Sequence, residues 1–343
     1  MYNTIYGCHW ASILLFFVQK MKKHPFVYIK PVYLLIFCQL PLEAWSWGFF
    51  AHKQINRYAI TTLPPGIFAF YKAHLTYLTE KAVNPDRRRY VIKGEAPKHF
   101  IDLEVYYSSL LNGQKLSFHQ AVEQYGDKIV AAHGHLPWAI LNAHKQLTEA
   151  FQHKDTAKIL KCSADLGHYI ADAHVPLHTT QNYNGQMTGQ EGLHALWETR
   201  LPVLFFDTYT LFVGQAVYIQ DLVGHIWDIV RESHALVNTV LDLEKQLSAQ
   251  YPEKYSFEQT GNLLKKQYSI AFSTAYHQAL QGQVEARLQK SIIEVGSFWF
   301  TAWINAGAPS LNDLHTAIAM QDEEEPLLQA GIILEGVRTC GDE

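Results

Sequence analysis

Along most of this chain, apolar residues recur every three or four positions, which is the period of an amphipathic helix. Strand-like alternation is scarce, and no internal repeat or flexible linker divides the sequence. The chain is therefore predicted to form a single all-α domain of several helices over residues 47–308. The predicted helices are Ala51–Thr62, Gly66–Lys81, Ser117–Tyr125, Pro137–His153, Thr156–Ala173, Ile219–Ser248, Leu263–Gln281 and Val284–Ala306.

Between these helices lie segments rich in turn-forming or charged residues. Val83–Pro97 is predicted to be a loop because it contains Asn-Pro-Asp and Lys-Gly-Glu. Its arginine run, Arg87–Arg89, is predicted to face solvent, with contact to phosphate oxygens as the alternative. Asn182–Gln190 is a second loop, rich in glycine, asparagine and glutamine. Residues 309–343 are predicted to be a flexible tail with the acidic run Asp322–Glu325.

The composition limits the classes of protein to consider. The chain has 343 residues, of which 48% are hydrophobic and 17% are charged, and its net charge is −4. That is enough apolar material for a large core in one or two domains. The charge balance is not basic, so the chain lacks the positive surface that avid binding of duplex nucleic acid requires. We expect no stable nucleic-acid complex.

The N-terminal region has the pattern of an export signal. A short basic stretch, Met21–Lys23, precedes the apolar run Val32–Leu40, and Ala44–Ser46 fits a small-x-small cleavage site. The pattern predicts a signal peptide over residues 21–46 and an upstream extension over residues 1–20. The apolar run is shorter than a membrane-spanning helix. The mature chain is therefore predicted to have no transmembrane segment and to be secreted or periplasmic.

Cleavage after Ser46 would leave a mature chain that starts at Trp47. A different interpretation of the upstream run Ala11–Val18 is a second apolar signal region or a membrane hairpin. The mature chain would contain two cysteines, Cys162 and Cys340, which is too few for a disulfide framework. We expect the two not to pair.

The segment Asp165–Glu198 contains candidate metal ligands. His168 and Asp172 are four positions apart, so on a helix they lie on one face, one turn above the other. His194 and Glu198 repeat this spacing on a second helical run. Imidazoles and carboxylates at this spacing on two helices are how a helical protein builds a zinc site.

A third histidine strengthens this interpretation. His178 follows Pro176, which should end or kink the first helix, so His178 can fold back towards the same space. A lone His-x-x-x-Asp pair is more often a surface hydrogen bond, but two such pairs and a further histidine in one segment favour a metal site. His174 lies two residues after Asp172, on another helix face, and is expected to pack or to face solvent.

These motifs, together with a Trp-Gly dipeptide at Trp47 followed by His52 and with the segment His99–Asp102, resemble one superfamily. It is the superfamily of zinc-dependent phospholipase C and the S-one/P-one nucleases. The resemblance runs to about Leu201 by motif and to about Ala306 by helix pattern. It implies three zinc ions per chain in a cleft of an all-helical domain.

Carried over residue by residue, the resemblance implies three ligand sets, two of which share a carboxylate. Asp172 would serve both sets, and Trp47 would bind through its free α-amine and its carbonyl. Catalytic roles are implied for Asp86 and Asp172. The first set would be Asp86, His99, His168 and Asp172, the second His178, His194 and Glu198, and the third Trp47, His52 and the shared Asp172.

Two further residues match a substrate-binding pair of this superfamily. Phe100 and Asp102, beside His99, resemble the residues that stack on a nucleobase and hydrogen-bond to it. The alternative is that Phe100 is a buried aromatic residue and Asp102 a cap. Both interpretations fit the sequence.

Paired metal ions suit the hydrolysis of phosphoric ester bonds, because they neutralise phosphoryl oxygens and activate water. The Trp-Gly start with His52 five residues later favours a nuclease that acts on single-stranded nucleic acid through a metal-activated hydroxide. Glu198 stands where nucleases usually carry aspartate, and it favours a phospholipase C that acts on phospholipid head groups.

A non-catalytic metal-binding or adhesion module is the alternative of another class. A helical phosphohydrolase of the HD type is excluded, since the chain has no adjacent His-Asp doublet.

Overall fold

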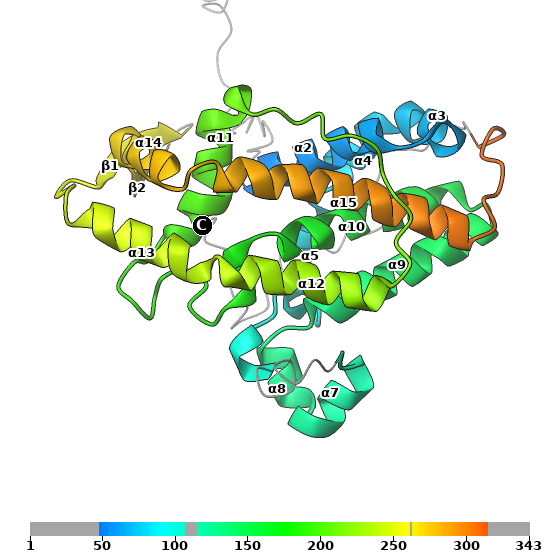
Figure 1. Ribbon diagram of the computed structural model, residues 1–343, viewed down its shortest axis with the longest axis horizontal. Coiled ribbons are helices and arrows are strands. Elements are labelled where there is room, and N and C mark those ends of the chain that lie inside the picture. The colour runs from blue at the N-terminus through cyan, green and yellow to red at the C-terminus, as the bar shows by residue number, and fades with distance from the viewer. Residues whose placement is uncertain (1–47, 107–114, 261–262, 315–343) are drawn as a thin grey trace, which may run out of the picture. The chain divides into compact units, whose positions relative to one another are not determined.

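The computed structural model describes residues 48–106, 115–260 and 263–314. By its internal contacts the chain divides into Met1–Ala44, which lies outside the described residues, and Trp45–Glu343, which contains all of them. The described residues are mostly helical, and their strands are confined to one two-stranded antiparallel sheet (Figure 1). The prediction of an all-α domain is therefore confirmed in part: the described residues are mostly helical, but they include this sheet.

Long helices alternate with short helical turns along the described chain. The α-helices are α2 (Gly48–Ala59), α3 (Pro65–Ala73), α4 (Leu75–Lys81), α5 (Asn84–Arg88), α7 (Phe118–Tyr125), α8 (Asp127–Ala132), α9 (Leu136–Gln152), α10 (Thr156–Ala173), α11 (Leu201–Phe205), α12 (Leu222–Ala235), α13 (Val237–Ser248), α14 (Ile270–Ala279) and α15 (Gln283–Asn305). The short turns are η1 (Ile60–Thr62), η2 (Ala96–His99), η3 (Leu103–Tyr106), η4 (Pro176–Thr179), the π-helical η5 (Ala195–Arg200) and η6 (Phe206–Thr208), and the strands are β1 (Tyr255–Thr260) and β2 (Leu263–Tyr268).

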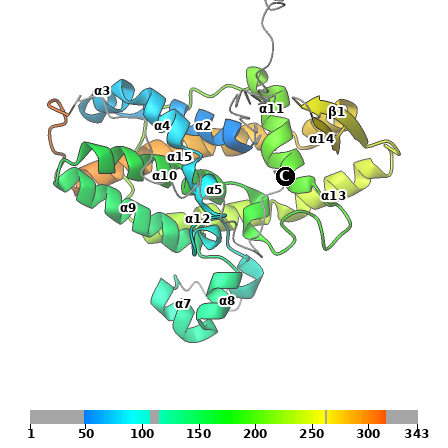
Figure 2. The ribbon, with the colours of Figure 1, turned by 180° about the vertical axis from the view of Figure 1, so that it is seen from behind.

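Helix α10 is the element around which the site is built. It packs against α2, α4, α9 and α15, which surround it in Figures 1 and 2. The Asp155 side chain caps its N-terminus by accepting a hydrogen bond from the Lys158 amide. Ser163 joins it to two neighbours, because its carbonyl accepts from Trp299 Nε1 at 3.0 Å and its hydroxyl lies 2.7 Å from the Tyr71 hydroxyl. Most of the residues of α10 are buried, as expected for an interior helix.

A glycine allows α2 to approach α10 closely. The Asn56 side chain of α2 is fully buried and donates to the carbonyl oxygens of Leu78 and Ala164, at 3.3 and 3.2 Å. A Cβ atom on Gly167 would lie only 2.0 Å from Asn56 Oδ1. Because Gly167 has no such atom, the ring of His52 can stack on that of the next residue, His168, with centroids 4.0 Å apart.

Replacement of Gly167 by alanine is expected to destabilise the protein. Alanine is the better helix former by roughly 1 kcal/mol, but the overlap with Asn56 forces α2 away and overpacking of this kind destabilises by about 1–3 kcal/mol. Gly224→Ala in α12 is the control, because its Cβ would meet only the exposed side chains of Asp221 and Lys115, which have room to shift. Denaturant unfolding compares the two variants. Equal stability would show that α2 is not held against α10 at this point.

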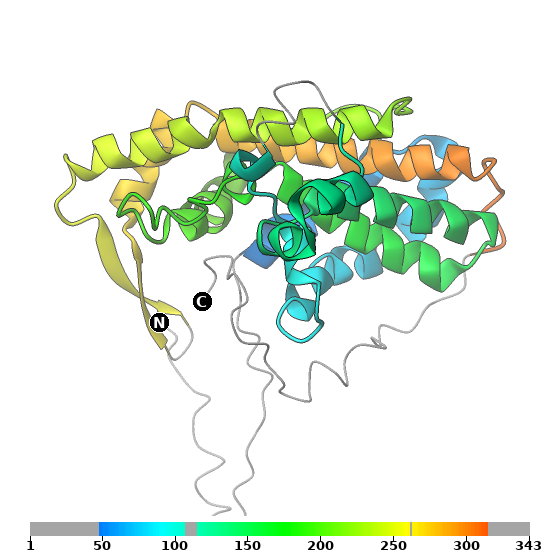
Figure 3. The same cartoon turned by 90° about the horizontal axis from the view of Figure 1, so that it is seen from below.

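The structure corrects four of the predicted elements. Gly66–Lys81 is two helices, α3 and α4, which separate at His74. Ile219–Ser248 is two helices, α12 and α13, which separate at Leu236. The first part of Leu263–Gln281 is strand β2, not helix, and pairs with β1 so that Tyr255 faces Tyr268 (Figure 3). Tyr255 and Phe257 of β1 share a face with Leu264 and Tyr268 of β2, and short segments with such apolar residues suit strand and helix alike. Val83–Pro97 contains the short helix α5, which begins with Asn-Pro as helices often do.

Helix α15 ends at Asn305, and Gly307 follows in a left-handed conformation with φ of 87°. The acidic run Asp322–Glu325 and Cys340 lie outside the described residues, while Cys162 is buried and unpaired in α10. Among the described helices, none has both the length and the apolar character that a membrane crossing requires.

Candidate metal centre

Eight of the nine predicted ligands lie within the described residues, and the structure brings all eight together. Each is between 0% and 9% exposed. They come from α2, α5, the end of η2, α10, η4 and the start of η5. The ninth predicted ligand, Trp47, lies outside the described residues. The eight are His52, Asp86, His99, His168, Asp172, His178, His194 and Glu198.

The first predicted set surrounds one oxygen of Asp172. His99 Nδ1 lies 3.0 Å from Asp172 Oδ2, and His168 Nε2 lies 3.3 Å from the same oxygen. Asp86 Oδ1 completes the group at 3.5 Å from His99 and 3.6 Å from His168. These four donor atoms converge from α5, η2 and α10, as the resemblance implied.

The second predicted set surrounds one oxygen of Glu198. His194 Nε2 lies 2.6 Å and His178 Nε2 3.2 Å from Glu198 Oε2, and the two imidazole nitrogens are 3.2 Å apart. Pro176 begins the turn η4 directly after α10, which returns His178 towards the helix that it follows. The prediction that His178 folds back towards the other ligands is confirmed.

His52 lies between the two sets. Its Nε2 atom is 3.4 Å from Asp172 Oδ1 and 3.5 Å from Glu198 Oε1. Each carboxylate thus offers one oxygen to an outer set and its other oxygen to His52. The sharing of Asp172 was predicted, but that of Glu198 was not. The spacing of His194 and Glu198 shows only that they share a helix face, and it carries no information on where the second oxygen points.

The hydrogen bonds of the outer imidazoles leave their inner nitrogens as lone-pair donors. The Nδ1 atoms of His168, His178 and His194 each lie 2.7–3.0 Å from a backbone carbonyl oxygen. A carbonyl only accepts, so Nδ1 carries the proton and a neutral ring has its lone pair on Nε2. The facing Nε2 atoms of His178 and His194 therefore need a cation between them and Glu198. Protons or a metal ion can supply it.

A second observation favours metal ions in this place. Asp172 Oδ1 is buried and accepts no hydrogen bond from the described residues, although it faces His52. Buried carboxylate oxygens without a donor are rare in proteins. Imidazole nitrogens and carboxylate oxygens are ligands that zinc prefers, so the chemistry of the donor set fits zinc.

The buried carboxylates of the centre are held in their charged form. Burial alone would raise the pKa of Asp172, but the imidazoles of His168 and His178 hold it well below its usual range. The pKa of Glu198 is likewise held low against burial, by His178 first. Burial lowers the pKa of His168, but Asp172 and then Asp86 raise it to about 9. Ionised carboxylates packed this deeply require compensating positive charge.

The arginine run does not face solvent as a whole, contrary to the prediction. Arg87 is exposed and lies over the Phe49 ring, with 5.8 Å between its Cζ atom and the ring centroid. Arg88 and Arg89 are buried because α5 turns them inwards. Arg89 Nη1 donates to Asp86 Oδ1 at 3.3 Å. The run thus supplies two buried guanidinium groups next to the centre, a feature that charge pattern alone does not distinguish from a solvated loop.

The two residues predicted to bind a base are buried. Phe100 and Asp102 are each 5% exposed, and Gly134 packs directly on Phe100. Asp102 Oδ2 lies 2.9 Å from His133 Nδ1, and the Asp102 amide donates to the carbonyl of His133. In this conformation both side chains are engaged within the protein, and their contact with a substrate stays a prediction.

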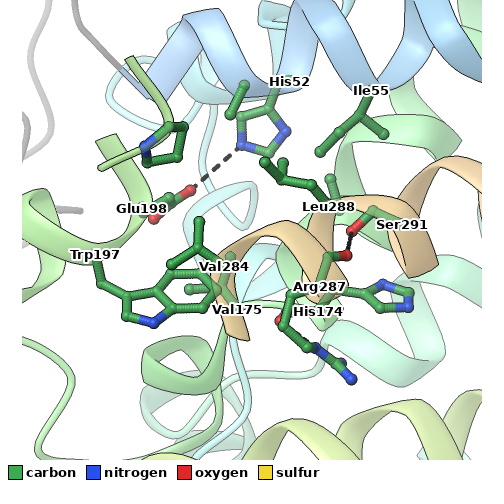
Figure 4. A pocket seen from close by; sticks show the side chains of 13 residues that line it. His52, Ile55, His174, Val175, Trp197, Glu198, Val284, Arg287, Leu288 and Ser291 are labelled. Carbon is green, nitrogen blue, oxygen red and sulfur yellow. Dashed lines mark hydrogen bonds and ion pairs between the residues drawn. The ribbon is translucent and has the colours of Figure 1, made fainter. Parts of the chain in front are cut away.

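Behind His52 and Glu198 lies a small cavity of about 30 Å³ (Figure 4). Apolar side chains such as Trp197 and Leu288 line much of it, and it is too small for a nucleotide or a head group. His174 lines it on the side away from His52 (Figure 4) and is 2% exposed, so the prediction that it packs is confirmed. The cavity therefore does not suit either of the substrates predicted from the sequence.

Comparison of the chain with protein-family models and with curated proteins found no match. The resemblance between the motifs of this chain and those of the zinc-dependent superfamily thus rests on the residues themselves and on the way in which they converge.

Proposed function

We propose that this protein is a zinc-dependent hydrolase of phosphoric ester bonds, of the S-one/P-one nuclease type, that acts on single-stranded nucleic acid. The supporting observation is the sharing of Asp172 and Glu198 among adjoining ligand sets. Two shared carboxylates suit a cluster of closely spaced metal ions, which is the arrangement that phosphodiester hydrolysis uses. In this proposal Trp47 completes the central set around His52.

Zinc ions bound by these ligands would lower the pKa of a bound water to about 7 and neutralise the charge of a phosphodiester. The side chains have distinct roles. Asp172 holds two ligand sets at a fixed spacing. Asp86 is the most exposed of the ligands at 9%, and it is the proposed acceptor for the proton of the attacking water. Arg89 fixes the orientation of Asp86 through its hydrogen bond.

Phospholipase C is the second candidate function. The side chain of Glu198 reaches both His194 and His52, and a glutamate here, where nucleases usually carry aspartate, is the feature that supports this candidate. Phospholipid head groups carry the same phosphodiester chemistry, so the metal centre suits both substrates. The two functions differ only in the surface that receives the rest of the substrate.

We expect elemental analysis of the mature protein to find three zinc ions per chain. The loaded protein is expected to hydrolyse single-stranded DNA or RNA faster than phosphatidylcholine, and removal of the metals with a chelator is expected to stop both reactions. One zinc or none after gentle purification would contradict the proposed centre. Three zinc ions with faster hydrolysis of phosphatidylcholine would select the phospholipase. Three zinc ions with no hydrolysis would favour the metal-binding or adhesion module.

A further inference from the structure

A buried guanidinium joins the three chain segments that carry the first ligand set. Arg88 lies in α5, two residues after Asp86. Its partners on α10 are Asp165 and Tyr169, which flank His168 in sequence. Its third partner, Glu95, comes four residues before His99. One side chain thus connects α5, α10 and the segment that ends in η2.

Arg88 donates hydrogen bonds from both terminal nitrogens of its guanidinium group. Nη1 donates to Asp165 Oδ1 at 3.1 Å, and Nη2 donates to Glu95 Oε1 at 3.2 Å and to the Tyr169 hydroxyl at 3.3 Å. Glu95 also accepts from the Tyr169 hydroxyl and, at 2.6 Å, from Lys98 Nζ. A fork of this kind fixes the relative orientation of its partners, which a lysine ammonium cannot do.

The same cluster contacts the ligand rings. The ring of Tyr169 packs edge-on against His99, with centroids 5.6 Å apart, and against His168, with centroids 5.8 Å apart. A shift of the Tyr169 ring therefore changes the packing contacts of both imidazole rings. Positions of metal ligands are sensitive to such supporting contacts, and their loss typically weakens metal binding 10–100-fold.

Stability alone does not explain the cluster. The side chains of Arg88 and Glu95 are 5% and 2% exposed, and burial opposes the charge of both. Arg88 and then Lys98 outweigh burial and lower the pKa of Glu95 to about 2. Buried ion pairs of this kind are often no more stabilising than apolar residues of similar size. Such ion pairs instead fix the relative positions of the segments that carry them.

We propose that Arg88 is a positioning residue that sets the spacing of Asp86, His99 and His168, and thereby the metal affinity of the first set. This inference rests on the proposed metal centre. In this proposal Arg88 acts through the segments that it joins. The second ligand set, built on η4 and η5, is not joined by it, and the third, built around His52 of α2, shares only Asp172 with the first.

Arg88 borders a cavity of about 610 Å³ whose walls also include Lys98 and Trp138. Water in this cavity can solvate Glu95 and the other acidic groups when the guanidinium is removed, so variants are expected to fold. Tyr169→Phe provides a milder change, since it removes only a hydroxyl group from the same cluster.

The test is zinc affinity measured by competition with a chelator, site by site, in the full mature chain. In Arg88→Met, one of the three zinc ions is expected to bind 10–100-fold more weakly while the other two bind as in the wild type. Arg88→Lys and Tyr169→Phe are expected to show smaller losses at the same site. The thermal stability of the metal-free forms is measured in parallel.

The chain offers a matched control for the structural part of the cluster. Glu244 is a fully buried carboxylate that, like Glu95, accepts from a lysine and a tyrosine, Lys254 at 2.7 Å and Tyr268 at 3.1 Å. Glu95→Gln and Glu244→Gln should destabilise the metal-free protein alike, but only Glu95→Gln should weaken the first zinc site. Unchanged affinity in Arg88→Met and Tyr169→Phe, with lower metal-free stability, would overturn the inference. A wild-type protein that binds no zinc would instead overturn the proposed function.

Discussion

Asp172→Asn is expected to remove most of the hydrolytic activity, with kcat/KM lower by on the order of 10³-fold, or about 4 kcal/mol of transition-state stabilisation. Asp172 Oδ2 lies beside the ring nitrogens of His99 and His168, and Asp172 Oδ1 lies 3.4 Å from His52 Nε2. Asparagine keeps the shape but loses the charge, and its amide nitrogen cannot bind a metal ion. Two ligand sets are therefore disturbed at once. His178→Ala should reduce activity less, because His178 belongs to one set.

Two further variants make this comparison sharper. Glu198→Gln should resemble Asp172→Asn, since Glu198 also serves two sets. His174→Gln is the control, because His174 lies between Asp172 and His178 in the sequence but is not one of the clustered ligands, and it lies on the side of the small cavity away from His52 (Figure 4). Zinc content and initial rates are measured for each variant. Similar, mild losses for Asp172→Asn and His178→Ala would argue against a shared carboxylate.

The sequence predicted the outer ligand sets well for a physical reason. Residues four apart on one helix share a face, so His168 with Asp172 and His194 with Glu198 were placed together by periodicity alone. Pro176 at the end of α10 placed His178. The long-range approach of His52, Asp86 and His99 was implied only by the resemblance. No periodicity links α2 or α5 to α10.

What the sequence did not predict depends on packing rather than pattern. Arg88 and Arg89 occur in a run that suits a solvated loop. Their burial depends on acidic partners, which are Asp165 and Glu95 for Arg88 and Asp86 for Arg89. Strand β2 was taken for the start of a helix, since its apolar residues fit either period. The second role of Glu198 depends on which way each carboxylate oxygen points. Tertiary contacts decide all these features, and a linear pattern does not record them.

Metal removal is expected to have the largest effect on stability. At a free-zinc concentration a thousand times Kd, each site would add about 4 kcal/mol to the free energy of unfolding. In a domain of this size, each kcal/mol lost from the free energy of unfolding lowers Tm by roughly 2–4 °C, so chelation should lower Tm by more than about 10 °C. Re-addition of Zn²⁺ should restore Tm, whereas Mg²⁺ should not, because Mg²⁺ prefers an octahedron of oxygen ligands.

The pH dependence distinguishes bound metal from bound protons. In the metal-free protein, the pKa of His168 is raised to about 9 from an ordinary value near 6.5. Its protonation therefore stabilises the fold fully below about pH 6.5, and this contribution is lost as the pH rises through about 9. The stabilisation that comes from metal binding has the opposite pH dependence, because protons compete with the metal for the imidazoles and metal affinity therefore rises with pH. The Tm difference between loaded and metal-free protein should widen from pH 6.5 to pH 9. A difference that stays constant or narrows would indicate that protons, not metal ions, neutralise the centre.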